Sequence, residues 1–510
     1  MKRLLLLLSA LIFLLTGCWE EDAPDNEADD FWAYSDEVTD AAEEAPGKPT
    51  VFTLPYLNSQ TLDPVACPDG VQQVVGSLLY EGLFVLDERF EAQPMLCSSY
   101  IRSGDGLTYT FNLRDGVVFS NGAELTSSDV LATYRRAQVS ERYAARFSNV
   151  VSMRVGRGTF TVTLRQGDSA FPALLDIPIV KSGTEKDTIP IGTGPYQFFT
   201  ADDGPFLVRS ESWWNDNSAL PERIALAGAK DADTAVYLFS AQNAHLLTAD
   251  LLSQTTAASL GGVDMADAPT TTMLFLGFNT RTPALSTPAL RTAMASAFDR
   301  EIAVTTLLAG HADAAQFPIS PRSALYPAAA EASYVPGTYA AALSALSDTS
   351  QQPDPVGLTL LVNEENSFKT ALAEYLARQL TAAHVTVTPV ALPWNEYLEA
   401  LESGAFDLWL GEIRLTADWN VTSLVGTGGA LNYGKFSDSD TDAALRAFLS
   451  NEDSATAAEL CAQLAEQAPI LPIAFKSLSV LTPQDMINGL SPTATQPLAN
   501  FEHWMFRFPT

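Results

Sequence analysis

Residues 189–199, IPIGTGPYQFF, hold two glycines, two prolines and three aromatic residues within eleven positions. Gly192 and Gly194 flank a threonine, and Pro195 and Tyr196 follow at once. Glycine adopts backbone angles that are closed to other residues, and proline fixes its own φ. The segment therefore predicts a tight bend through which the chain leaves one layer of structure and enters another. An ordinary surface turn is the alternative that these residues leave open.

The N-terminus predicts a secretory signal over residues 1–17. A basic start, KR, precedes an apolar run at residues 4–15, and this run is too short for a comfortable membrane span. The run ends in LLTGC at residues 14–18. This ending resembles a bacterial lipobox, and the resemblance implies that Cys18 is lipidated and becomes the mature N-terminus. A plain signal peptide followed by a chance cysteine is the alternative.

An acidic block follows the cysteine. Between Trp19 and Gly47 there are twelve carboxylates and no Lys or Arg, and such a segment cannot bury enough apolar surface to fold. We predict a flexible tether over residues 18–49, and a coil of about 30 residues spans roughly 30 Å. The whole chain has a formal net charge of −32 and shows no local basic patch, which argues against nucleic acid as a partner.

The reactive side chains give little support to a metal, cofactor or catalytic site. Three cysteines remain after Cys18 without CxxC spacing, and the four histidines are scattered, so a zinc site is not supported. The sequence holds no GxSxG, HExxH or P-loop, and the GTGG at residues 426–429 lacks the lysine of a phosphate cradle. We therefore predict that the protein is not an enzyme and takes no cofactor. A disulfide between Cys67 and Cys97 stays open.

Residues 107–134 predict strands followed by a helix. Residues 107–113 alternate apolar and polar, which is the period of a half-buried strand. Residues 117–119 predict a second strand, beside the strong hairpin signal Asn121-Gly122. Thr126 is then placed to cap a helix, with Asp129 three residues later, where the acid of a capping box belongs.

Four motifs occur in order along the chain. They are YEGLFVLDERFEAQPML at residues 80–96, DGLTYTFNLRDGVVFSNGAELTSSDV at 105–130, IGTGPY at 191–196 and LGFNTRTPALSTPALRTAMASAFDRE at 276–301. Together they resemble the peptide/nickel class of extracellular solute-binding proteins, family 5, which serve ABC transporters. The resemblance runs from about Phe52 to the end of the chain. It implies an α/β, periplasmic-binding-protein-like fold of type II (cluster C), with two lobes, an additional inserted subdomain and a ligand cleft between the lobes.

The resemblance also implies how the chain is divided. We expect a discontinuous lobe I, a subdomain inserted into it, and a continuous lobe II. The expected ranges are 50–84, 190–275 and 472–510 for lobe I, 85–189 for the inserted subdomain, and 276–471 for lobe II.

The chain departs from the family pattern at three places. Ser120 stands where the family often has His, and the AEL at residues 123–125 replaces the usual TPL. After Ala417-Asp418 the chain reads Trp419-Asn420, where the family has a second Asp-Pro. The last departure bears on the class of ligand more than on the fold.

The C-terminal half carries helix and strand patterns of its own. From Pro288, a four-residue spacing of large apolar residues predicts one helix, which Gly310 is placed to end; its members are Leu290, Met294, Phe298 and Ile302. Segments between residues 358 and 410 alternate strand and helix, which predicts a βαβ series with ligands near the loops at the strand ends. The pair Trp213-Trp214 predicts core packing, with a ligand-stacking platform as the alternative.

The resemblance implies capture of a solute between the lobes. We expect the lobes to close about Gly192 and Gly194, with Pro195 and Tyr196, and so to bury a peptide or a similar small solute, since hinge closure is usual for periplasmic-type receptors. The protein would be a monomer, held by its lipid anchor at the outer face of the cytoplasmic membrane, and would deliver its ligand to ABC permease subunits. Two alternatives stay open: a peptide-sensing or pheromone-presenting lipoprotein without a transport role, and a binder of nickel chelate or oligosaccharide.

Candidate ligand-binding residues follow the strand expected at residues 407–410. The resemblance places Asp418 in a loop that clamps the α-ammonium group of a peptide, and a carboxylate suits that task because it accepts charge-assisted hydrogen bonds. The walls of the pocket would be formed by Trp394, Trp409 and Trp419. Arg414 would pair with a ligand carboxylate. The alternative is that Asp418 caps a turn and the tryptophans belong to the core.

Overall fold

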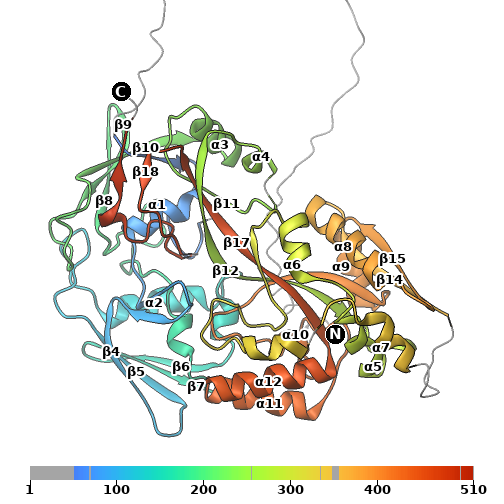
Figure 1. Ribbon diagram of the computed structural model, residues 1–510. Helices are drawn as coiled ribbons and strands as arrows, with labels where there is room; N and C mark the ends of the chain where they lie inside the picture. Colours follow the sequence, from blue (N-terminus) through green and yellow to red (C-terminus); the bar gives the residue numbers. More distant parts are fainter. Residues whose placement is uncertain are drawn as a thin grey trace, which may run out of the picture.

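The computed structural model describes residues 51–508, apart from 68–69, 254, 334, 347–354 and 494. The signal segment, Cys18 and the acidic tether lie outside the described residues. Two lobes stand side by side, joined by the long strands β12 (Val263–Phe278) and β17 (Ile470–Pro483) (Figure 1). Within the described part of the chain, no helix is both long enough and apolar enough to cross a membrane.

Lobe I is built on the four-stranded sheet β1-β10-β9-β8, in which β1 runs parallel to β10. Its core joins residues far apart in sequence: Phe52 stacks on Phe501 with ring centroids 5.6 Å apart. The bounds are β1 (Thr53–Leu57), α1 (Val71–Leu79), β8 (Tyr196–Ala201), β9 (Gly204–Arg209), β10 (Arg223–Ala229), α3 (Ala232–Ser240), α4 (Thr255–Ala258), β18 (Ile487–Asn488) and β19 (Met505–Phe506).

The inserted subdomain consists of the antiparallel sheet β4-β5-β7-β6 and helix α2. Tyr109, Phe111 and Leu113 of β5 are buried while the residues between them are not, which confirms the predicted alternation. The capping box is also confirmed, because the Thr126 amide donates to Asp129 Oδ2 at 3.0 Å. The bounds are β4 (Cys97–Arg102), β5 (Thr108–Leu113), α2 (Ser127–Ala137), β6 (Val150–Val155) and β7 (Thr159–Leu164).

The strand predicted at residues 117–119 does not form. Only a single bridge, Val118 with Glu124, spans the turn at Gly122. The chain enters α2 directly afterwards, with Thr126 as its N-cap, so the pairing has no room to extend.

Lobe II is built on a seven-stranded sheet of order β11-β17-β12-β16-β14-β15, with β13 paired to β17. Strand β11 joins this sheet at the lobe I end of β17. Strand β14 pairs in parallel with both β15 and β16, and helices α8 and α9 make the crossovers, so the predicted βαβ series is confirmed. The bounds are β11 (Leu247–Ala249), β13 (Ala312–Ala314), β14 (Val356–Asn363), α8 (Ser367–Leu380), β15 (Val385–Leu392), α9 (Trp394–Ser403), β16 (Leu408–Arg414), α10 (Thr422–Val425), α11 (Ser439–Ser450) and α12 (Ser454–Gln467).

The single helix predicted from Pro288 is interrupted. Helix α5 (Pro288–Met294) ends early, and a new start, α6 (Arg300–Ile302), leads into a π-helical turn at Ala303–Leu307. The cause is Asp299, whose side chain accepts from the Ile302 amide at 3.1 Å and caps the second segment. Ile302 consequently leaves the buried face and is 48% exposed.

The chain passes between the lobes in β12 and β17. Val480 and Leu481 of β17 belong to lobe I cores, whereas Ile473 and Phe475 of the same strand belong to lobe II cores. The pairing of β12 with β17 shifts register between Pro269 and Met273, at the level where the two lobes meet.

Candidate functional site

The segment that joins the inserted subdomain to β8 lies against the end of α1. A Cβ built on Gly194 would stand 2.6 Å from both the Leu78 carbonyl oxygen and the Leu79 carbonyl carbon. The Gly194 amide donates to Leu79 O at 2.9 Å, and the Ser120 amide donates to Gly192 O at 2.9 Å. Neither Gly192 nor Gly194 has a positive φ. The expectation that these glycines supply special backbone angles is therefore wrong, and they are needed because two backbones approach closely.

A buried carboxylate, Glu81, ties this segment to the tryptophan pair Trp213-Trp214. It accepts from Thr193 Oγ1 at 2.8 Å and from Nε1 of Trp213 and Trp214 at 3.0 Å each. Burial raises the pKa of Glu81 to about 7, against the lowering effect of these hydrogen bonds and of Arg114. The tryptophan pair is partly buried and packs against the cores of lobe I and the inserted subdomain, as the sequence predicted, and its two N–H groups donate to Glu81.

The predicted hinge residues lie within one side of the molecule. Gly192, Gly194, Pro195 and Tyr196 connect the inserted subdomain to the sheet of lobe I, and the Tyr196 hydroxyl donates to Pro221 O at 2.8 Å. The strands that run from lobe I to lobe II are β12 and β17. Closure about the two glycines stays a prediction.

Asp418 lies in the turn after β16 and is 2% exposed. Its Oδ1 accepts from the Thr416 hydroxyl and from the Asn420 amide, the latter at 3.3 Å. Burial raises the pKa of this carboxyl, and the hydrogen bonds from Thr416 and Asn420 act in the opposite direction. Both of these hydrogen bonds fall on Oδ1, so Oδ2 is the atom that has acceptor capacity to offer a ligand.

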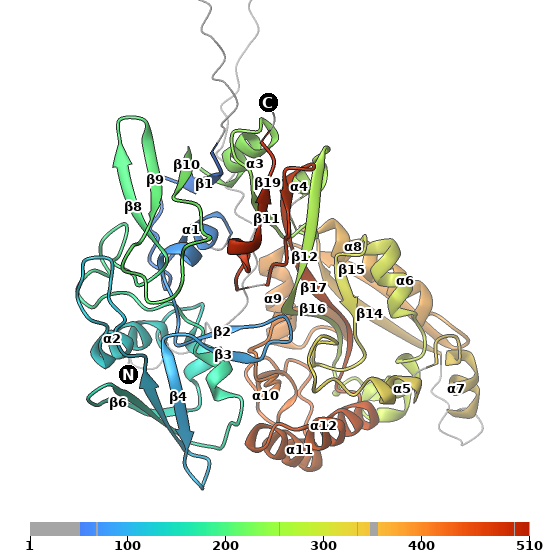
Figure 2. The same ribbon diagram turned by 60° about the vertical axis from the view of Figure 1, so that its left-hand side comes forward.

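Aromatic rings from both sides of the boundary between the lobes pack on Trp419, the residue after Asp418. Its φ is 52°, a left-handed value that is uncommon for a bulky residue. Its ring meets Phe475 of lobe II edge-on with centroids 5.8 Å apart, and it meets Phe90 edge-on at 5.2 Å. Phe90 comes from the tip of the hairpin β2–β3 (Phe84–Leu86 and Ala92–Pro94), which extends toward lobe II (Figure 2).

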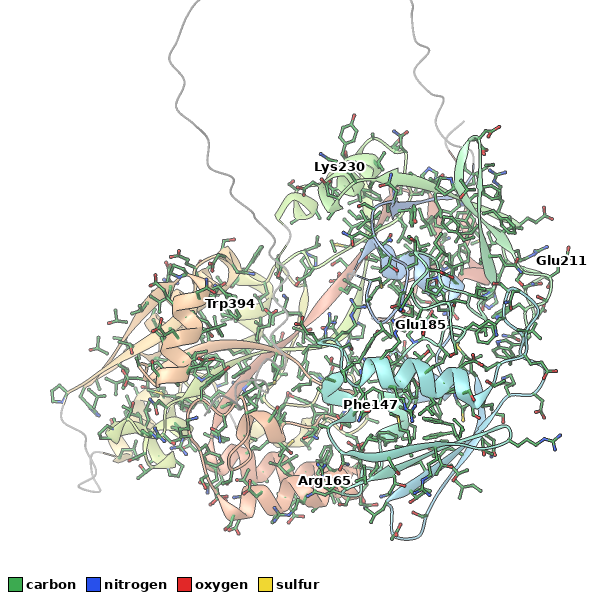
Figure 3. The ribbon with its side chains drawn as sticks, turned by 180° about the vertical axis from the view of Figure 1, so that it is seen from behind. Phe147, Arg165, Glu185, Glu211, Lys230 and Trp394 are labelled. Atoms are coloured by element: carbon green, nitrogen blue, oxygen red, sulfur yellow. The ribbon has the colours of Figure 1, made fainter. Side chains whose placement is uncertain are left out.

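The other predicted site residues lie at different depths around the same core. Trp409 is 7% exposed, contacts Phe275 edge-on at 4.8 Å and fills the space above Gly277. Trp394 begins α9 on the lobe II side of the molecule, where it stacks on Tyr397 at 5.6 Å (Figure 3). Arg414 is exposed at the end of β16. Their role in a ligand pocket stays a prediction.

The inserted subdomain touches lobe II close to Asp418. The loop after β7 meets the turn between α11 and α12 through two hydrogen bonds: the Ser169 amide donates to Leu449 O at 2.9 Å, and the Glu452 amide donates to Ser169 Oγ at 2.7 Å. A third bond joins Arg102 Nη2 to Ser450 O at 2.8 Å. Figure 3 shows Arg165, just after β7, beside these helices. These contacts bring Asp168, from the subdomain, and Glu452, from lobe II, to the same place.

Asp168, Asp418 and Glu452 form a buried carboxylate cluster across the boundary between the lobes. Burial, and then the charge of Asp418, raise the pKa of Asp168 well above its ordinary value. Burial, Asp418 and Asp168, in that order, raise the pKa of Glu452 to about 10. The three side chains therefore sense one another's charge. Sequence analysis missed Asp168 and Glu452 because 284 positions separate them in the sequence and no motif marks either one.

Other features of the described residues lie apart from this cluster. A hollow of about 570 Å³ is lined by Asn279, Arg281 and Asp407, near the opposite end of β16. In the described part of the chain, no group of three or more His, Cys, Asp or Glu side chains is placed to hold a metal ion. Among the described cysteines no disulfide forms: Cys97 Sγ lies 3.2 Å from Ser99 O, and Cys67 Sγ lies 3.8 Å from Arg142 Nη1.

A buried ion network occupies the level where β12 and β17 pass between the lobes. Glu412 of β16 lies 3.0 Å from Lys369 Nζ and 3.4 Å from Lys476 Nζ, and Lys476 also pairs with Asp250. Although burial alone would raise it, the pKa of Glu412 is lowered by the two lysines. Two positive and two negative groups balance one another, so this network is self-contained.

Comparison with known proteins agrees with this architecture. A family model described as bacterial extracellular solute-binding proteins, family 5 Middle, matches residues 91–431, more than half of the chain. The glutathione-binding protein GsiB of Salmonella typhimurium is 26% identical over 425 residues, covering 78% of this chain and 82% of that protein.

Solved structures share the fold at low identity. The substrate-binding protein CtaP of Listeria monocytogenes superposes with a TM-score of 0.71 at 20% identity, covering 89% of this chain and 99% of that one. The oligopeptide-binding protein AppA of Bacillus subtilis, in complex with a nonapeptide, gives a TM-score of 0.60 at 19% identity and covers 90% and 99% of the two chains.

Proposed function

Because the chain belongs to the bacterial extracellular solute-binding proteins of family 5, we propose that it captures a peptide, or a similar small solute, and delivers it to the permease of an ABC importer. The ligand is held between the two lobes and bridges them. Binding, without chemical conversion, is the whole of the activity. The names of the relatives support a peptidic ligand, since GsiB is a glutathione-binding protein and the AppA structure holds a nonapeptide.

The observation that carries this proposal is the buried carboxylate of Asp418 at the boundary between the lobes. Burying a charge is costly unless it is paired. Asp418 is 2% exposed and, within the described part of the chain, accepts hydrogen bonds from one hydroxyl and one amide. An α-ammonium group supplies the missing positive charge, and a charge pair 4 Å apart is worth about 4 kcal/mol at an effective dielectric near 20, before desolvation.

The surroundings of Asp418 suit a ligand held mainly through its main chain. Phe90 meets Trp419, the residue after Asp418, and the Asp418 carboxylate is 2% exposed; a low-dielectric surrounding strengthens a charge-assisted hydrogen bond. Micromolar affinity corresponds to about −8 kcal/mol. Main-chain hydrogen bonds together with one or two charge pairs can supply it, so varied ligand side chains are tolerated.

The membrane location belongs to the same proposal. Cys18 carries diacylglycerol and holds the folded lobes outside the cytoplasmic membrane on the acidic segment of residues 18–49. A labelled fatty acid fed to cells should appear on the wild-type protein and not on Cys18→Ser. Equal labelling of the two proteins would exclude the lipid anchor and leave the binding function untouched.

The binding function is tested with Asp418→Asn, which keeps the shape and removes the charge. A pool of random tripeptides with free amino termini is offered to the purified protein, and retained peptides are identified by mass spectrometry. One retained peptide and its N-acetylated form are then titrated by calorimetry. Asp418→Asn should weaken the free-amine peptide at least tenfold and leave the acetylated peptide nearly unchanged.

The exposed Asp440 provides the matched control in the same lobe, and Asp440→Asn should bind both peptides like the wild type. An unchanged affinity of Asp418→Asn for the free-amine peptide would remove Asp418 from the site. A wild-type protein that retains no peptide from the pool would exclude the peptide class and direct the search to other small solutes.

A further inference from the structure

The carboxylate cluster of Asp168, Asp418 and Glu452 has unused acceptor atoms. Asp168 is 3% exposed, yet its Oδ1 is shielded from solvent and has no hydrogen-bond partner among the residues that the structure describes. Glu452 Oε1 is equally shielded and has no partner among them either. Buried polar atoms are nearly always paired, and each exception calls for an explanation such as an ion or ligand that binds there.

The loops that carry these residues are held in place by their own backbone bonds. Ser169 follows Asp168 directly and binds both Leu449 O and the Glu452 amide. The Tyr109 hydroxyl donates to the main-chain oxygen of Asp168 at 2.7 Å. The backbone of Asp168 is thus anchored, and its carboxylate, which the amides of Ala170 and Phe171 also stabilise, lies close enough to Asp418 to sense its charge.

Nearby cations do not neutralise the cluster. Arg146 acts on the charge of Asp418 but forms its ion pair with Asp176. Arg102 acts on the charge of Asp168, while its Nη2 donates to Ser450 O. Two arginines therefore act on three carboxylates, and one of these arginines, Arg146, already pairs with Asp176. The net charge of the five side chains is negative when the three carboxylates are ionised.

We propose that Asp168 and Glu452 complete, with Asp418, a binding site for a primary ammonium group that is assembled from both lobes. An ammonium group has three N–H donors and no acceptor, and the cluster offers three carboxylates with unused oxygens. Asp168 reaches the ligand from the inserted subdomain, and Glu452 and Asp418 reach it from lobe II. The inference rests on the proposed function and adds that the cationic end of the ligand itself connects the two lobes.

The pKa values of the cluster predict how the ammonium group binds. Because burial, Asp418 and Asp168 raise the pKa of Glu452 to about 10, the ligand-free site holds a proton at neutral pH. An ammonium ion takes the place of that proton, so binding releases a proton to the solvent. Affinity should therefore increase as pH rises toward the pKa of the ligand amine. A neutral or acetylated amine releases no protons, because it brings no charge to replace them.

The first experiment needs no ligand. Asp168→Asn and Glu452→Gln each remove a carboxyl whose pKa is raised in the folded protein, so that its ionisation in the unfolded chain favours unfolding at pH 8. Both variants should therefore raise the unfolding temperature of the ligand-free protein at that pH. Glu459→Gln, on the exposed face of α12, is the matched control and should leave the temperature unchanged. Two variants that unfold below the control would mean that both acids stabilise the fold, and this would overturn the proposal.

The second experiment uses the free-amine tripeptide retained in the test of Asp418. Asp168→Asn and Glu452→Gln should each weaken it at least fivefold, although the ligand-free variants are more stable. Calorimetry in two buffers of different ionisation enthalpy should show proton release in the wild type and less in both variants.

The two proposals fail in different ways. If Asp418→Asn weakens the peptide while both new variants bind like the wild type, Asp168 and Glu452 lie outside the site and the solute-binding function stands. If no tripeptide is retained, the solute-binding function fails for peptides, and methylammonium and calcium chloride become the probes. Stabilisation by methylammonium that Asp168→Asn removes supports the ammonium site, whereas stabilisation by calcium alone, or by neither probe, overturns it.

Discussion

Replacing Gly194 with alanine tests why the segment of residues 189–199 needs glycine. The added Cβ would meet Leu78 O and the Leu79 carbonyl carbon at 2.6 Å and Leu79 O at 2.8 Å. All three are backbone atoms at the end of α1, so no side chain can rotate away. The segment must retreat, and the hydrogen bond from the Gly194 amide to Leu79 O, 2.9 Å long, is then lost or lengthened.

The expected cost combines two terms. Overpacking a close contact costs about 1–3 kcal/mol, and losing one buried hydrogen bond costs a further 0.5–1.5 kcal/mol or so. A loss of about 2–4 kcal/mol would lower the unfolding temperature of a unit of 150–250 residues by on the order of 5–15 °C. Calorimetric unfolding measures this temperature, and hydrogen exchange at the Gly194 amide reports whether the bond to Leu79 persists.

Gly104→Ala is the matched control for Gly194→Ala. Gly104 lies in the inserted subdomain and has an ordinary φ. A Cβ added to it would have no other heavy atom within 4 Å. Alanine there should be neutral or slightly stabilising, by about 0.4–1 kcal/mol, because it restricts the unfolded chain. If both alanine variants unfold at the same temperature, the close approach of the two backbones does not constrain residue 194, and the reasoning is refuted.

Two further predictions concern buried groups at the lobe contacts. Glu81 has a folded-state pKa of about 7, above its ordinary 4.5, so ionisation opposes folding and the stability of the wild type should fall by about 3 kcal/mol as pH rises from 4.5 through 7. Glu81→Gln should flatten that decline in calorimetric scans, and parallel pH profiles would contradict it. Phe90→Ala removes a ring that is 6% exposed and meets Trp419, at a cost of about 3–5 kcal/mol to the arrangement in which the lobes touch. Small-angle scattering should give a larger radius of gyration for Phe90→Ala than for Tyr237→Ala, whose ring is 67% exposed, and equal radii would show that Phe90 does not hold the lobes together.

Sequence patterns predicted the features that depend on residues close together in the sequence. The alternation in β5, the Thr126 capping box and the βαβ crossings of β14, α8 and β15 all rest on local spacing, and all are confirmed. The helix from Pro288 was predicted from the spacing of apolar residues alone. The prediction was wrong because Asp299 caps a new helix start within that spacing. The spacing of apolar residues carries no information about a residue that can cap a second helix.

Contacts between distant residues could not be predicted in the same way. Glu81 meets Trp213 across 132 positions, and Phe90 meets Trp419 across the boundary between the lobes. Nothing near Glu81 in the sequence distinguishes it from an exposed acid. The sequence also did not predict why residues 192 and 194 are glycine. Their need for glycine comes from the backbone of Leu78 and Leu79, which leaves no room for a Cβ, and this depends on where α1 ends in space.

The path of β17 has a consequence for how the chain is made. Its Val480 and Leu481, together with Met486, Ile487, Leu498, Phe501 and Trp504, complete lobe I cores whose other members come from residues 52–263, and Phe501 packs on Phe52. Chains fold progressively as they emerge during synthesis. The lobe I core therefore stays incomplete, with apolar surface exposed, until almost the whole described chain has emerged. The inserted subdomain, in contrast, has all its strands by Leu164. A ribosome that stops within lobe II releases a product whose lobe I core lacks its C-terminal residues, and proteases can recognise that unfinished core.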